Sequence, residues 1–478
     1  MGQAHPSGLD VRLEENQRTS LEGKAENGTW VKSTGMNRTE KKNERARETA
    51  WANKPSPGSA ELHKGWFLIT LLYLVIDYGR PQEFLPIGFL RPSLLCVSAL
   101  TLCLVANSVW GQLRSKQVTL ILLFEGLLIV LIPVARNNMA AFQTAQLMLV
   151  YLPFIFSTIV CVDSLQRMRT MINLLILLMI HQGVYSIFHG GKGAGSYFAD
   201  ENDLSLFVNM WLPLCYFLCL EEKRPLHRAF YGLGLVVAVG SIAVSFSRGG
   251  FVGLIAVGFV AWSFSSKKVL STVLLVFVGF LFYWSTGEEY WREMSTMTDS
   301  EDQTVNERIL SWKAAWAMFL DNPWGVGGNN FQKQFPRYQS KELKRGMWNR
   351  PAHSVWFTLI PELGVGGIVV YLLLLWYNLK DVFRIRKRNH ACSGAEGRFV
   401  SALTAGFLGS MAGYFASGSF LSVLYYSHYW YLTGIIVATR KILEREMDFT
   451  GGVAGSKYGG EPLQNTINRK ERYLTKPP

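Results

Sequence analysis

The stretch from 353 to 367 combines groups that could do chemistry with the start of a long apolar run. It reads HSVWFTLIPELGVGG, so His353 and Ser354 stand where polar residues give way to apolar ones, and Gly364-x-x-Gly367 follows. Ionisable groups at such a membrane boundary are costly and are functional candidates by default. An imidazole with an ordinary pKa of about 6.5 can take a proton from a hydroxyl near neutral pH. We therefore take His353 as the candidate catalytic base, the alternative being a structural histidine at a helix start.

Two arginines distant from His353 in the sequence could bind an anion. Arg248 lies in SFSRGGF, a turn whose glycines allow close approach, and a guanidinium can bind a phosphate through two parallel hydrogen bonds. Arg308 lies in ERILSWKAAW, where an amphipathic pattern begins. The alternatives are an arginine that reaches from a helix end to the membrane surface and a solvated surface charge. The basic half of the segment before His353 favours anion binding. It contains Arg308, Lys313, Lys333, Arg337, Lys341, Lys344, Arg345 and Arg350 against Asp321 and Glu342.

Other polar residues are weaker candidates. Arg80, Arg91 and Arg136 could extend an anion-binding rim, and Asp77 in DYGRPQ could act as a general base. The eight histidines show neither an HExxH motif nor a paired-ligand spacing, which predicts that the protein has no zinc site. The GxxxxGK[ST] pattern of nucleotide hydrolases is also missing from the sequence, so we expect no nucleotide hydrolysis.

The composition predicts a membrane protein. Of the 478 residues, 49% are hydrophobic, and apolar windows close to the ~20 residues needed to cross a bilayer recur from Gly65 almost to Arg440. A large soluble protein would show amphipathic periodicity, and barrel strands would alternate in short segments. We predict an all-α, polytopic membrane helical bundle of about twelve transmembrane helices. The predicted spans are 65–80, 87–108, 117–135, 141–161, 170–189, 203–220, 229–246, 249–265, 268–285, 353–379, 399–417 and 420–439.

The distribution of basic residues predicts the orientation of the bundle. A net charge of +13 would suggest nucleic acid in a soluble chain, but here lysines and arginines gather in short loops on one side. With the amino terminus in the cytoplasm, inner loops carry about three times as many of them as short outer loops, which is a positive-inside signal. We therefore expect no nucleic-acid partner, both termini in the cytoplasm, and residues 286–352 outside it.

The long outer segment 286–352 contains an amphipathic pattern. Apolar residues recur at three- and four-residue steps, and Asn322-Pro323 ends the pattern, which predicts a helix over 304–320 lying across the mouth of the bundle. The apolar stripe consists of Val305, Ile309, Trp312, Trp316, Phe319 and Leu320. The domain organisation that we predict is a disordered cytoplasmic tail (1–63), a transmembrane domain (64–440) and a cytoplasmic carboxy-terminal tail (441–478).

Four local patterns resemble those of the O-antigen ligase and O-antigen polymerase superfamily of bacterial membrane glycosyltransferases. They are SRGG at 247–250, ERILSWKAAW at 307–316, NPWGVGGNNF at 322–331, and HS followed by nine residues and GxxG at 353–367. A multi-span chain with one large outer loop late in the sequence is also typical of this superfamily, and the resemblance spans most of residues 65–440. Val252 stands where the ligase pattern usually has leucine, so the resemblance leaves the subgroup open.

The resemblance implies a metal-independent transfer of a glycan from a polyprenyl-diphosphate carrier to an acceptor hydroxyl, on the periplasmic side of the bacterial inner membrane, without cofactor or nucleotide sugar. Carried over by residue, His353 activates the acceptor while Arg248 and Arg308 hold the donor diphosphate. The acceptor stays open among lipid A core, the growing glycan and a protein. The alternative is a transporter or flippase of lipid-linked glycans, but such proteins tend to have internal repeats and broken or charged helices near the midplane.

Overall fold

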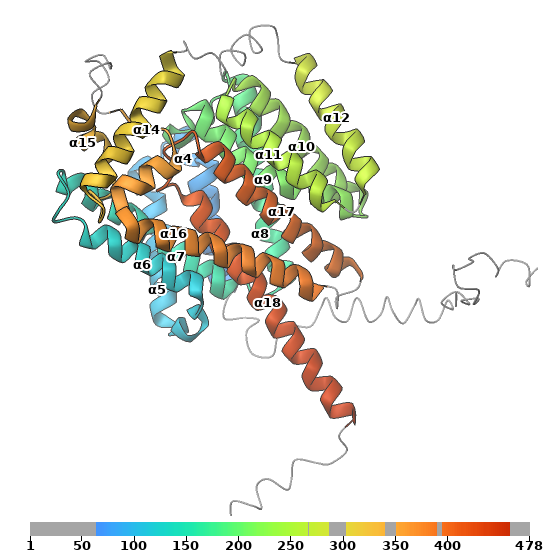
Figure 1. Ribbon diagram of the computed structural model, residues 1–478. Coiled ribbons are helices and arrows are strands. Elements are labelled where there is room, and N and C mark those ends of the chain that lie inside the picture. Colours follow the sequence, from blue (N-terminus) through green and yellow to red (C-terminus); the bar gives the residue numbers. More distant parts are fainter. Residues whose placement is uncertain (1–63, 266, 286–302, 340–349, 390–393, 459–478) are drawn as a thin grey trace, which may run out of the picture. The chain divides into compact units, whose positions relative to one another are not determined.

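The described part of the protein is entirely helical. The computed structural model describes residues 64–265, 267–285, 303–339, 350–389 and 394–458, so the predicted disordered tail over 1–63 lies outside it. Within these ranges the predicted all-α class is confirmed. The helices are α3 (Lys64–Leu74), α4 (Pro81–Phe84), α5 (Pro92–Ala106), α6 (Lys116–Val130), α7 (Asn138–Cys161), α8 (Leu165–Phe188), α9 (Glu201–Glu221), α10 (Pro225–Val244), α11 (Arg248–Phe264), α12 (Lys268–Ser285), α14 (Gln303–Asp321), α15 (Phe331–Tyr338), α16 (Val355–Arg388), α17 (Gly394–Gly418) and α18 (Ser427–Tyr458) (Figure 1).

Many of these helices could cross a membrane. By length and composition, seven described helical segments qualify: Gly88–Ala106, which includes α5, and α7, α8, α9, α10, α16 and α17. The helix α11 and the beginning of α12 are apolar but shorter. Every predicted span overlaps a helix. The protein is therefore a multi-pass membrane protein, while the count of twelve crossings stays a prediction.

Small residues bring the central helices close together. Helix α9 packs against α17, α11, α10 and α8, and most of its surface is buried. A Cβ added at Gly413 of α17 would lie 2.5 Å from the carbonyl oxygen of Asn209, and one at Gly253 of α11 would lie 2.0 Å from the hydroxyl of Ser417. Glycine at both positions allows the close backbone approach that membrane helices use for packing. This packing positions the start of α11, where Arg248 lies.

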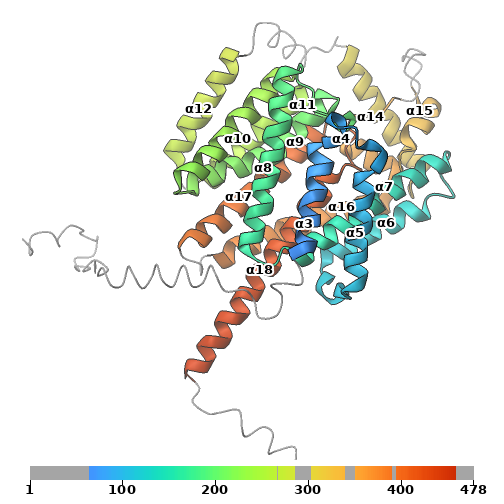
Figure 2. The same ribbon diagram turned by 180° about the vertical axis from the view of Figure 1, so that it is seen from behind.

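The helices nearer the amino terminus form a second set of contacts. Seen from behind in Figure 2, α3 and α5 lie beside α7, and α8 lies beside α10. On the carboxy-terminal side, α16 packs against α6, and α18 packs against α7. Helix α18 continues through the predicted domain boundary at 440, so no structural break separates the transmembrane domain from the first part of the predicted tail.

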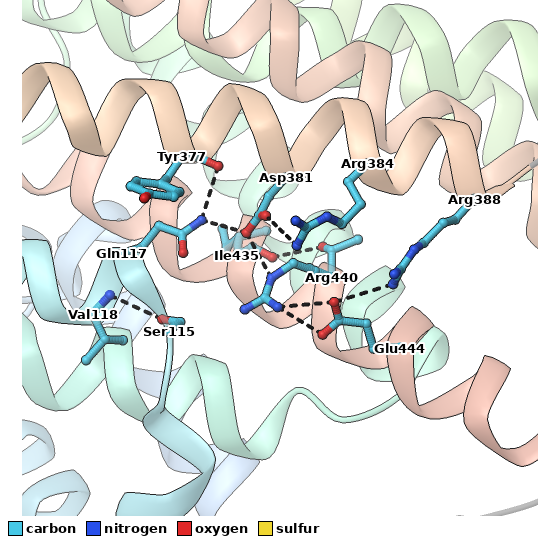
Figure 3. Close-up of polar contacts among 11 residues, drawn as sticks. Ser115, Gln117, Val118, Tyr377, Asp381, Arg384, Arg388, Ile435, Arg440 and Glu444 are labelled. Atoms are coloured by element: carbon cyan, nitrogen blue, oxygen red, sulfur yellow. Dashed lines mark hydrogen bonds and ion pairs between the residues drawn. The ribbon is translucent and has the colours of Figure 1, made fainter.

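A network of charged side chains joins α6, α16 and α18 near the end of α16 (Figure 3). The buried carboxylate of Asp381 lies 2.8 Å from Nε of Arg440 and accepts a hydrogen bond of 2.6 Å from Gln117. Glu444 continues the network to Arg440 at 2.9 Å and to Arg388 at 3.4 Å. At 1.5 Å of rise per residue, the network lies roughly 35–40 Å along α16 from its start. It therefore stabilises the end of the bundle that is remote from the His353 turn.

The predicted amphipathic helix forms, and its buried face consists mainly of small residues. Helix α14 (Gln303–Asp321) covers the predicted range of 304–320 and packs against α15 and α16. Its buried residues include Ala314, Ala315 and Met318, whereas Trp316 and Leu320 of the predicted stripe are exposed. The buried face is made of small residues and Met318, which lie in one cluster with Phe331 and Phe335 of α15.

Candidate functional site

His353 occupies the turn just before α16 and has an unusual backbone conformation. Its φ is 48°, in the left-handed region that costs a non-glycine residue roughly 1–2 kcal/mol. Its backbone N–H donates to the hydroxyl of Ser422 at 2.9 Å. The next residue, Ser354, caps α16 by accepting the N–H of Phe357 at 3.4 Å. The half-buried imidazole therefore belongs to the start of a helix, where unpaired N–H groups favour anions.

Two residues of α14 hold the start of α16 and the chain that enters it. Trp312 donates its indole N–H to the carbonyl of Ala352 at 2.9 Å and stacks on Phe357 with ring centroids 5.1 Å apart. Glu307 forms an ion pair with Arg350. Together these contacts fix the first half of α14 next to the turn that carries the histidine.

The electrostatic surroundings of His353 identify the charges that face it. Burial and the positive charges of Arg308 and Arg350 lower the pKa of His353 to about 4, while Asp200 acts in the opposite direction. Arg308 is therefore close enough to act on the imidazole, although it lies in the second turn of α14 and not at the helix start that the sequence suggested. At neutral pH His353 is uncharged, so its ring can accept a proton.

Arg248 is the first residue of α11. The preceding residue, Ser247, is buried and accepts the N–H of Gly250 at 2.9 Å, which caps the helix. The hydroxyl of Ser247 donates to the side-chain oxygen of Asn202 at 2.7 Å. Asn202 follows Asp200 by two residues at the start of α9. The turn that carries Arg248 is thus tied to the loop whose carboxylate acts on the histidine.

The end of α17 and the segment that follows it, residues 417–422, contact the starts of both α11 and α16. A Cβ added at Gly249 would lie 3.6 Å from the carbonyl oxygen of Ser417. On the other side, the indole N–H of Trp356 donates to the hydroxyl of Ser419 at 3.1 Å. The helix starts that carry the outer arginine and the histidine therefore meet across this segment.

The pattern NPWGVGGNNF forms a loop that docks on a break in α16. Gly364 has a φ of 59° and interrupts the helix, contrary to the expected helical GxxG step. The N–H of Val326 donates to the carbonyl of Pro361 at 2.9 Å, and the N–H of Val365 donates to the carbonyl of Pro323 at 2.9 Å. Backbone groups that a continuous helix would pair internally are therefore paired with the loop.

Glu362 is the residue of this region that sequence reasoning missed. It is 2% exposed, and its carboxylate accepts the N–H of Asn329 at 2.7 Å, the N–H of Phe331 at 2.9 Å and the hydroxyl of Tyr425 at 2.6 Å. It joins the 322–331 loop to the segment before α18. It could have been found from the sequence, because an acidic residue inside an apolar run is costly unless it has hydrogen-bond partners.

Residues 233–372 match the O-antigen ligase family model. This match supports the predicted resemblance to the O-antigen ligase and polymerase superfamily over that part of the chain. No curated protein matches the sequence. The O-antigen ligase match and the apolar helices support a membrane glycosyltransferase of ligase or polymerase type. Four residues of the region just described lie within the match: Arg248, Arg308, His353 and Glu362.

Arg80 lies outside the O-antigen ligase match but is linked to the start of α9. Its φ is 53°, and its guanidinium lies 5.2 Å from the centroid of the Tyr197 ring. Tyr197 packs on Tyr426 with centroids 5.0 Å apart, and the hydroxyl of Tyr426 donates to Asp203 at 3.0 Å. Aromatic side chains thus connect Arg80 to the start of α9, next to Asp200, whose charge acts on His353. Asp77 lies in the short π-helical turn just before Arg80.

Arg136 also lies outside the O-antigen ligase match and has different neighbours. It is exposed in the connection between α6 and α7. The next residue, Asn137, donates its N–H to the side chain of Asn330 at 2.8 Å. The structure therefore places Arg136 beside the 322–331 loop, whereas the contacts described for the start of α16 and the turn before it are with α14 and residues 417–422.

Proposed function

We propose that this protein transfers a glycan from a polyprenyl-diphosphate carrier to an acceptor hydroxyl. The observation that carries the proposal is the grouping of a neutral imidazole with the cationic side chains of Arg308 and Arg350 at a helix start. Arg248 lies on the adjoining helix start. We assign base catalysis to His353 and donor binding to Arg248 and Arg308, with Arg80 and Arg136 extending the donor surface.

The proposed reaction is a single displacement at the anomeric carbon of the donor glycan. The bond between this carbon and the diphosphate oxygen breaks, and the electron pair leaves with the diphosphate. The acceptor oxygen bonds to the same carbon, and its proton moves to the ring of His353. Negative charge grows on the diphosphate as the bond breaks, so preorganised guanidiniums stabilise the transition state more than the ground state.

Donor binding also tunes the base. The charges of Arg308 and Arg350, together with burial, lower the pKa of His353 to about 4. A bound diphosphate offsets this positive field, which raises the pKa of the imidazole towards its ordinary value. His353 therefore becomes a stronger base once the donor is in place, and the acceptor is activated only when there is a glycan to receive.

We propose that the protein lies in the bacterial inner membrane. Both termini are then in the cytoplasm, and the His353 turn is on the periplasmic side. The excess of basic residues in the predicted inner loops supports it. The acceptor is one of three classes: lipid A core, the growing glycan or a protein side chain. Glycan analysis of a strain that lacks the protein distinguishes among them. Loss of long glycan chains indicates the growing glycan as acceptor, whereas loss of glycan attachment indicates lipid A core or a protein.

The experiment uses the full chain in proteoliposomes supplied with polyprenyl-diphosphate-linked glycan and acceptor. The wild-type protein should release polyprenyl diphosphate and form glycosylated acceptor, and His353→Ala should abolish both. His189→Ala is the matched control, because His189 is an exposed histidine at the end of α8. Wild-type rates in His353→Ala would eliminate the assigned role. Passage of intact donor across the bilayer without bond cleavage would favour the alternative transporter or flippase of lipid-linked glycans.

A further inference from the structure

Helix α14 carries a row of large apolar side chains that the described part of the protein leaves uncovered. Ile309 is 40% exposed, Trp316 50% and Leu320 63%, and Trp324 in the following turn is 77% exposed. At 3.6 residues per turn, the first three lie on one side of the helix. Isolated exposed apolar residues are ordinary, but a contiguous row marks a surface that contacts something apolar. We call these four residues the α14 stripe.

The other side of α14 already has its partners. Ala314, Ala315 and Met318 are buried against Phe331 and Phe335 of α15. The orientation of the helix is therefore set by the protein, and the stripe is held outward and cannot turn inward to be buried in the bundle.

The α14 stripe continues onto the outward face of a membrane-spanning helix. Trp324 directly follows Pro323, whose carbonyl accepts the N–H of Val365 at 2.9 Å. From Val365, exposed apolar side chains run along α16 at helical spacing: Val365 is 43% exposed, Val369 50%, Leu372 47% and Trp376 61%. Because α16 is long and apolar enough to cross a membrane, we expect this face of it to contact lipid.

The composition around the stripe is that of a membrane–water boundary. Tryptophan contributes two of its four side chains, and tryptophan is enriched where hydrocarbon meets headgroups. Lys313 is exposed on the same side of α14, between the positions of Ile309 and Trp316. A lysine at this place can bury its methylenes beside the stripe while its ammonium reaches phosphate.

We propose that α14 is an interfacial helix whose stripe is inserted among the phospholipids of the leaflet on the His353 side of the bundle. The stripe lies at the boundary between acyl chains and headgroups, as amphipathic helices in a membrane interface do. Arg308 directly precedes Ile309, so lipid contact along the stripe holds this arginine near the depth of the lipid phosphates. The lipid bilayer thus helps to position α14 against the turn before α16.

The test is photo-crosslinking to lipid, which reads contact and not activity. Trp316→benzoylphenylalanine and Leu320→benzoylphenylalanine are made in the full chain and reconstituted into vesicles of phosphatidylethanolamine and phosphatidylglycerol with a trace of fluorescent phosphatidylethanolamine. Val369→benzoylphenylalanine marks a lipid-facing position on α16. Arg337→benzoylphenylalanine marks an exposed position on α15, outside the stripe.

The expected result is that positions 316 and 320 capture labelled lipid about as well as position 369 and several-fold more than position 337. Capture at 316 and 320 no greater than at 337 overturns the proposal. Crosslinked dimers at these positions in place of lipid overturn it too, because they identify a second copy of the chain as the occupant. Neither outcome bears on glycan transfer, which the His353 variants test separately.

Discussion

The carboxylate of Glu362 accepts a hydrogen bond of 2.6 Å from the hydroxyl of Tyr425. The first residue lies at the break in α16 and the second in the segment before α18. The same carboxylate accepts two backbone N–H groups of the 322–331 loop. One buried side chain therefore holds together three stretches of chain: α16 at its break, the 322–331 loop and the segment before α18.

Removal of the Glu362 carboxylate should destabilise this arrangement. Glu362→Ala leaves three donors without this acceptor, one buried and two partly buried, and we expect a loss of roughly 3 kcal/mol in the free energy of unfolding. Glu362→Gln should cost less but still be harmful, because the amide NH₂ faces donors. Thermal unfolding in detergent measures both, and the exposed Glu83→Gln is the control. A wild-type melting temperature for Glu362→Ala would contradict the role.

Gly364→Ala should disrupt the docking of the 322–331 loop. A Cβ at this position would lie 2.3 Å from the carbonyl oxygen of Pro323, and the φ of 59° disfavours any side chain. We expect a cost of at least about 3 kcal/mol together with loss of glycan transfer. In the control, Gly366→Ala, the new Cβ meets only methyl groups of Leu127 at 3.3 Å and 3.5 Å. If Gly364→Ala and Gly366→Ala lose stability and transfer activity equally, docking of the 322–331 loop is not the cause of the loss.

The pH dependence of transfer should report the lowered pKa of His353. Because this pKa is about 4, the imidazole is neutral down to about pH 5, so kcat/KM should fall only below that pH and not near 6.5. Arg308→Gln removes a charge that lowers the pKa, so its acidic limb should move to higher pH, in addition to its lower rate. The exposed Arg337→Gln is the control. If the acidic limb of the Arg308→Gln profile lies at the same pH as in this control, Arg308 does not act on the pKa of His353.

The same shift has a consequence for folding. The folded-state pKa of His353 lies below the ordinary value of 6.5, so the unfolded chain binds this proton more readily. The contribution of the group to stability is thus lost as pH falls from about 6.5 to about 4. His353→Gln should reduce the acid sensitivity of unfolding in that window.

The charge network at the far end of α16 should affect stability without affecting chemistry. Asp381→Ala leaves Arg440, a mostly buried cation, without its closest carboxylate, and we expect a loss of roughly 2–4 kcal/mol. Arg384→Ala should change little, because its side chain is 40% exposed and 3.6 Å from Asp381. Initial rates per folded molecule should stay at the wild-type level in both. A specific loss of rate in Asp381→Ala would show coupling between the two ends of α16.

The pattern of apolar residues along the chain was sufficient to predict the helices. A run of apolar residues long enough to cross a bilayer has to satisfy its own backbone hydrogen bonds, and a helix does so. The break at Gly364 was not predictable on that basis, since the loop that pairs with it lies some forty residues earlier in the chain. Glu362 was overlooked for a related reason. Its three donors come from two other segments, and only the folded chain brings them within hydrogen-bonding distance.

The sequence by itself determined the all-helical class, the membrane character and the resemblance carried by His353, Arg248 and Arg308. These follow from residue type and spacing along the chain. Only the tertiary structure decided that Arg308 acts on the imidazole, that Arg136 lies beside the 322–331 loop, and that Trp316 and Leu320 of α14 point outward. Hydrophobic periodicity defines an apolar face but does not say what covers it, since that depends on which surfaces of distant segments fit together.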